Sequence, residues 1–201
     1  IHSQADDIFT PVSMDSILAS SERATVPIQE GWEPPSAQSA AVVQAILDKA
    51  CSLRVNSQEL AHISQLLNYL FTPTRIENLA EHYFEFWHPH CPLLHKPSFR
   101  VETAPISLLI SITLMGAMYS PVDREVNTAK LLLDVAELYI YGIEDLTDEF
   151  EIRQMLRASQ ARSPEQSVGP SLLAFQHLQS AYLMVCIQFW AGNMVARRRA
   201  V

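Results

Sequence analysis

The residues best suited to chemistry gather in one short stretch that holds His82, His88, His90, Cys91 and His95. Imidazole and thiolate groups are the commonest zinc ligands in proteins, so residues of these types could form a metal site. Their spacing argues against one, because His88 and His90 flank a proline and cannot share a helical face as a His-x-x-x-His pair does. We therefore interpret these side chains as groups that cap, hydrogen-bond or pack around a proline-rich turn.

Signatures of catalysis are absent from the rest of the sequence. It contains no G-x-S-x-G nucleophile elbow and no glycine-rich phosphate loop. We expect no catalytic, cofactor-binding or metal-ligating residue in this chain. The alternative that stays open is a metal-dependent helical enzyme that uses His82, His88, His90 and Cys91.

Composition and charge narrow the class of protein further. Hydrophobic residues make up 48% of the 201, enough to bury a sizeable core, and only five are glycine, which favours long helices over a turn-rich β fold. The formal net charge of −8 argues against a basic surface that could bind a phosphate backbone. The one basic run, residues 197–199, is interpreted as a charged helix end. Direct DNA binding by this chain is therefore not expected.

The three cysteines, Cys51, Cys91 and Cys186, lie far apart and form no C-x-x-C pair. They cannot build a four-ligand zinc site by themselves, and an odd number argues against a secreted disulfide scaffold. The sequence therefore indicates a reducing, intracellular compartment.

Two apolar stretches need to be distinguished from membrane spans. Residues 106–119 are too short, because a span needs about 20 apolar residues. Residues 171–190 are long enough, but they contain glutamines and a histidine that lipid would penalise. Both stretches are predicted to be buried core helices, and no membrane partner is expected.

Hydrophobic periodicity predicts helices throughout, with no alternating strand pattern of useful length. Ser57 is the expected N-cap of the second helix, and Thr74 that of the third, with Glu77 completing a capping box. Gly116 lies inside an apolar helix, which indicates close packing against a neighbour. The expected helices span residues 40–53, 57–70, 74–88, 105–118, 122–141, 150–156 and 170–192.

The resulting fold class is all-α, a multi-helix array of antiparallel-packed helices with a disordered N-terminal arm. Residues 1–39 are rich in proline, serine and acidic side chains, and they are predicted to be a flexible linker. Residues 40–73 form a helical lead-in, and residues 74–201 form the main domain. Residues 89–104 should be a proline-stiffened connection between two helices.

The turn after the aromatic helix resembles the opening of the fungal-specific transcription factor domain, also called the middle homology region. That family has an aromatic-rich helix followed by a His-Pro and a His-x-Pro pair at a set spacing. The matching motif residues in this sequence are His88, Pro89, Pro92, Leu93, Leu94, His95, Pro97, Ser98 and Phe99. Residues 116–120 (Gly-Ala-Met-Tyr-Ser), 178–193 and 196–200 also resemble later parts of the domain. The resemblance covers residues 75–201.

The resemblance implies a regulatory, non-catalytic domain of a nuclear fungal zinc-finger or zinc-cluster transcription factor. Zinc and DNA contact would then belong to a DNA-binding domain outside this chain, which looks cut out of a longer protein. Transcriptional co-regulators or a small effector would be the partners of the helical part. A plain helical interaction scaffold is a further alternative. On this interpretation the motif residues His88, Pro89, Pro92, His95, Pro97 and Phe99 are structural.

Overall fold

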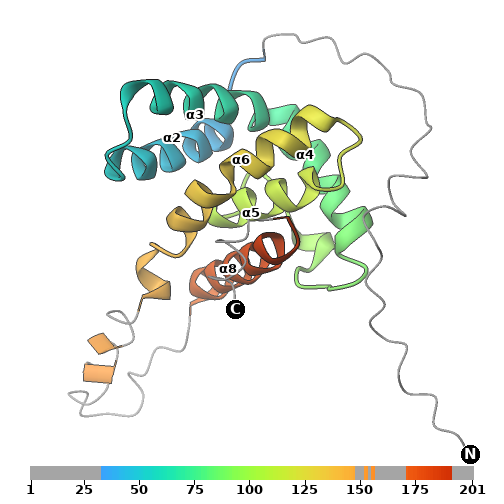
Figure 1. The fold of residues 1–201 in the computed structure, drawn as a ribbon. Coiled ribbons are helices and arrows are strands. Elements are labelled where there is room, and N and C mark those ends of the chain that lie inside the picture. Colours follow the sequence, from blue (N-terminus) through green and yellow to red (C-terminus); the bar gives the residue numbers. More distant parts are fainter. Residues whose placement is uncertain (1–32, 148–151, 154, 157–170, 192–201) are drawn as a thin grey trace, which may run out of the picture. The chain divides into compact units, whose positions relative to one another are not determined.

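A computed structural model describes residues 33–147, 152, 153, 155, 156 and 171–191, and every regular element among them is helical. The prediction of an all-α fold is thereby confirmed. The α-helices are α2 (Ala37–Ser52), α3 (Ser57–Leu70), α4 (Pro73–His82), α5 (Ile106–Ala117), α6 (Asp123–Ile140) and α8 (Leu172–Ala191). Shorter elements are the π-helical η1 (Tyr83–Trp87) and the 3-10 turns η2 (Lys96–Ser98) and η3 (Glu144–Leu146). Figure 1 shows their arrangement.

Several predicted segments lie outside the described residues. These are residues 1–32 of the expected linker and disordered arm, residues 170 and 192 at the two ends of the last predicted helix, and the basic run at 197–199. The linker prediction is wrong at its end, because α2 begins at Ala37 and its N-cap Ser36 accepts a hydrogen bond from the amide of Ser39 at 3.1 Å. Of the helix expected at 150–156, the residues that are described are helical.

Two predicted N-caps are wrong by one or two residues. Asn56 rather than Ser57 caps α3: it accepts a hydrogen bond from the Glu59 amide at 2.8 Å, and the Glu59 carboxylate accepts one from the Asn56 amide at 2.9 Å. Thr72 rather than Thr74 caps α4, because Pro73 takes the first helical position, where its fixed φ and missing N–H carry no cost.

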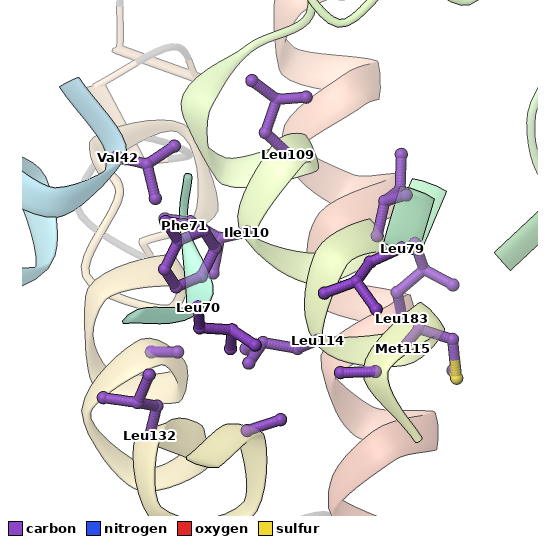
Figure 2. Packing of buried hydrophobic residues seen from close by; sticks show 14 of the residues in the cluster. Val42, Leu70, Phe71, Leu79, Leu109, Ile110, Leu114, Met115, Leu132 and Leu183 are labelled. Carbon is purple, nitrogen blue, oxygen red and sulfur yellow. The ribbon is translucent and has the colours of Figure 1, made fainter. Parts of the chain in front are cut away.

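Helix α5 is the centre of the fold. Every residue from Ser107 to Ala117 is buried, as predicted for a helix that is apolar almost all round. It contacts α2, α4, α6, α8 and η1. Figure 2 shows its side chains Leu109, Ile110, Leu114 and Met115 among residues of the other helices. Residues of α2 and α3, the predicted lead-in, belong to this same core.

Helix α8 is buried along one side only. Leu183, Met184 and Ile187 face the core, whereas Leu172 is 74% exposed and Leu178 56%. The prediction of a buried core helix therefore holds for one side of α8 only. The helix is long and apolar enough to cross a membrane, yet its inward polar residues Gln179 and Ser180 hydrogen-bond to the rest of the fold, as expected of a helix in a folded domain.

Helices α4 and α5 approach each other closely at Gly116. An ideal Cβ at this position would lie 1.8 Å from the backbone oxygen of Leu79 in α4, and 2.7 Å from its carbonyl carbon. No side chain fits there without separating α4 from α5. The expectation of close packing at Gly116 is confirmed.

Replacing Gly116 by alanine should destabilise the chain by about 2 kcal/mol, because an overpacking cost of about 3 kcal/mol exceeds the gain of about 1 kcal/mol in helix propensity. Urea unfolding followed by circular dichroism measures the change. Gly142→Ala is the matched control: its Cβ would meet the flexible end of Lys49 at 2.9 Å and the backbone oxygen of Leu138 at 3.0 Å, far less severe contacts than the 1.8 Å at Gly116. Equal losses in the two variants would contradict the role given to Gly116.

Candidate functional site

The proline turn, residues 88–99, is closed by one histidine. Nε2 of His88 lies 2.7 Å from the backbone oxygen of Leu94, to which the ring N–H donates. His88 is half-buried and Leu94 is buried, so this bond satisfies a carbonyl that has little access to water. It joins the start of the turn to its far arm.

An aromatic cluster centred on Phe84 packs against both ends of the turn. The ring centroid of Phe84 lies 4.9 Å from that of Tyr83, and 5.2 Å from those of both His88 and Phe99. The ammonium group of Lys96 lies 5.5 Å above the same ring. Residues at the two ends of the motif, His88 and Phe99, are thus held against one buried side chain.

The three prolines of the motif and its second histidine lie at the surface. Pro89, Pro92 and Pro97 are exposed, where a missing N–H costs nothing and a fixed φ limits the path of the chain. His95 is also exposed, and its Nδ1 lies 3.0 Å from the hydroxyl of Ser98 rather than near a backbone group. The predicted motif therefore divides into a packed part and a surface part.

The turn rests against helix α8 (Figure 1). The side chain of Gln179 donates a hydrogen bond to the backbone oxygen of Leu93 at 2.8 Å. Three residues further along α8, the hydroxyl of Tyr182 lies 3.9 Å from Sγ of Cys91. Residues three apart share a helical face, so one face of α8 receives the turn. In the sequence, Gln179 stands out as a polar interruption of an apolar stretch and as part of a segment that resembles the family, but neither feature predicts this contact.

Helix α8 is set against α5 by a buried cluster of serines. The hydroxyl of Ser111 donates to the backbone oxygen of Ser180 at 3.0 Å, and the hydroxyls of Ser180 and Ser107 are 3.1 Å apart. All three serines are buried. Buried polar groups need their partners, so these bonds fix the register of α8 on α5.

A second polar junction joins α3, α4 and α6. The guanidinium of Arg75 lies 3.3 Å from the carboxylate of Glu125, which is buried, and donates to the backbone oxygen of Tyr69 at 2.7 Å. The guanidinium groups of Arg75 and Arg124 lie 4.1 and 4.0 Å from the centre of the Tyr69 ring. The hydroxyl of Ser120 donates to the other carboxylate oxygen of Glu125. The buried charge of Glu125 is therefore compensated.

The histidines and the cysteine of the turn do not converge on a metal site. His82 packs against Phe86 at 6.0 Å, with its Nδ1 buried and without a hydrogen-bond partner, and His90 is exposed. His88 binds Leu94 and Cys91 contacts Tyr182. Within the described part of the chain, no three His, Cys, Asp or Glu side chains lie close enough to hold a metal ion. The geometry that a metal-dependent enzyme would need is not formed by these four residues.

The comparisons with known proteins point to one family. Residues 80–196 match the model of the fungal specific transcription factor domain. The chain is 22% identical over 197 residues to a protein called transcription factor verF from Penicillium polonicum, across 96% of this chain and 26% of that protein. It is 31% identical over 71 residues to zinc finger protein C11D3.17 of Schizosaccharomyces pombe, across 33% of this chain and 12% of that protein. The chain thus spans about a quarter or less of these relatives. No solved structure matches it.

Replacing His88 by alanine should destabilise the chain by about 1–2 kcal/mol, because the Leu94 carbonyl loses its donor in a poorly hydrated place. His95→Ala removes an exposed imidazole from the same turn, and it should change the free energy of unfolding by less than about 0.5 kcal/mol. Both values come from urea unfolding. A larger loss for His95→Ala than for His88→Ala would refute this division of the motif.

Proposed function

The chain belongs to the fungal specific transcription factor domain family, and on that basis we propose that it is the regulatory, non-catalytic domain of a fungal transcription factor. The observation that carries the proposal is the position of the family match. It runs from the end of α4 through the proline turn and α5 to the last described helix. The match therefore includes the turn and the face of α8 that receives it.

In this proposal the chain does not itself contact DNA. Its formal net charge is −8, and an acidic surface repels phosphate groups. One relative is called a zinc finger protein, which supports the idea that zinc and DNA contact belong to another part of the same protein. The domain would then act in the nucleus, where it modulates the output of transcription by RNA polymerase II.

The regulatory partner in this proposal is a protein co-regulator or a small effector. The exposed side of α8 carries large apolar side chains, among them Phe175, Phe189 and Trp190, each about half exposed. Apolar side chains that gather along one helix are typical of a surface that another protein covers. This surface supports a protein partner more directly than a small molecule.

A reporter assay tests the regulatory role. The 201-residue chain is fused to an unrelated DNA-binding domain and expressed in a fungal host with a matching promoter. We expect reporter output to change at least about threefold, in either direction, relative to the DNA-binding domain alone. The same fusion with Gly116→Ala should lose that effect, whereas Gly142→Ala should keep it. An unchanged output from a fusion shown to be folded would contradict the proposal.

Metal analysis separates this proposal from the metal-dependent enzyme. The purified chain should contain well under one zinc ion per molecule by elemental analysis. Substitution of His90 by alanine should leave that value unchanged. Stoichiometric zinc that disappears in His90→Ala or Cys91→Ser would instead support the enzyme that uses His82, His88, His90 and Cys91.

A further inference from the structure

Two of the three cysteines lie beside Tyr182, where the proline turn lies against α8. Sγ of Cys91 lies 3.9 Å from the hydroxyl of Tyr182. Cys186 follows Tyr182 by one helical turn on the same face of α8, and Tyr182 is near enough to lower the pKa of its thiol. One tyrosine therefore lies next to two cysteines from segments that are distant in the sequence.

Small solutes can reach this pair. Cys91 and Cys186 are each half-buried, and Tyr182 between them is 47% exposed. The third cysteine, Cys51, is exposed near the end of α2. Exposure alone would make Cys51 the most reactive of the three, so the special feature of the other two is that they are neighbours.

A second hydroxyl lies near the same sulfurs. Tyr83 is fully buried, and its OH has no hydrogen-bond partner, which is uncommon for a buried donor. Its pKa is raised by burial and, less strongly, by the neighbouring Cys91 and Cys186. Both phenols thus remain protonated near neutrality, and a protonated hydroxyl can donate to sulfur as negative charge develops there.

The two thiols are not equivalent. Burial raises the pKa of the Cys186 thiol, and the hydrogen bond from Tyr182 only partly offsets this effect. The Cys186 thiol is therefore less ionised than that of an ordinary exposed cysteine. Cys91 lies in the turn, outside any helix, so bond formation requires movement of the turn rather than of α8. Cys91 is accordingly the thiol that reacts first, and Cys186 the one that resolves.

We propose that Cys91 and Cys186 form an oxidisable dithiol whose substrates are peroxides, and whose disulfide fastens the proline turn to α8. The Cys91 thiolate attacks one peroxide oxygen, the O–O bond breaks, and a sulfenic acid and a hydroxide ion form from hydrogen peroxide. The hydroxide takes up the proton that the Cys91 thiol released on ionisation, and this gives one water. The Cys186 sulfur then attacks the sulfenic sulfur. An S–S bond forms as the hydroxyl leaves with the thiol proton as a second water. Two thiols supply the two electrons that reduce one peroxide, and a thiol reductant reverses the reaction by exchange.

Peptide mapping of the oxidised chain tests this proposal directly. The reduced 201-residue chain is treated with hydrogen peroxide, free thiols are blocked, and non-reduced peptides are identified by mass spectrometry. We expect a Cys91–Cys186 cross-link as the main product, with Cys51 still blocked as a free thiol, and a melting temperature at least roughly 5 °C higher that dithiothreitol reverses. Absence of that cross-link, or disulfides between molecules as the main product, would overturn the proposal.

Three variants test which cysteines react, in which order, and whether the Tyr182 hydroxyl assists. Cys51→Ser should cross-link as the unchanged chain does. Cys186→Ser should give no cross-link, and it should accumulate a Cys91 sulfenic acid that dimedone traps. Tyr182→Phe keeps the ring but removes the hydroxyl beside Cys91, and it should slow cross-linking at least about threefold with little change in melting temperature. Dimedone labelling of Cys51 in preference to Cys91 in the Cys186→Ser variant would refute the assignment of Cys91 as the first thiol.

Discussion

The structure depends on the contact between Gly116 and the backbone of Leu79. With the glycine Cα facing a carbonyl directly, α4 and α5 approach more closely than any side chain would permit. Because η1 continues from α4, this contact also places Tyr83 and Phe84 against α5. Phe84 in turn holds both ends of the proline turn through His88 and Phe99. One missing Cβ thus determines where the turn begins.

Helix α5 also positions α8, which forms the other side of the site. Its serines fix the register of α8 through buried hydrogen bonds. Ser180 follows Gln179 directly, so the residue that binds α5 and the residue that binds the turn are adjacent in the sequence. A shift of α8 by one residue would break both bonds together. The core therefore positions both the turn and α8, and the hydrogen bond between Gln179 and Leu93 depends on that positioning.

The elements that could be predicted from the sequence are those specified by local pattern. Helix α5 is apolar on all sides, so its burial needs no knowledge of its neighbours, and Gly116 within it signals a close crossing. The end of α4 differs, since the amide of His88 bonds to the oxygen of Tyr83 five residues earlier in a π turn. Nothing in the residues themselves indicates this, because π turns depend on tertiary packing. The partners of Gln179 and Tyr182 likewise come from a segment far away in the sequence. The structural role of the proline motif stays a prediction.

The energetics of these contacts explain why the turn and α8 are suited to regulation. Helix α5 buries eleven consecutive residues, and each large apolar side chain contributes about 1.5–3 kcal/mol, so the core cannot be opened without unfolding the domain. The polar contacts described between the turn and α8 are one amide hydrogen bond at 2.8 Å and one long contact between a thiol and a hydroxyl at 3.9 Å. A hydrogen bond contributes about 1 kcal/mol. A partner that covers α8, or an oxidant that joins Cys91 to Cys186, can therefore change this contact while the core stays intact, because the energies involved differ by an order of magnitude.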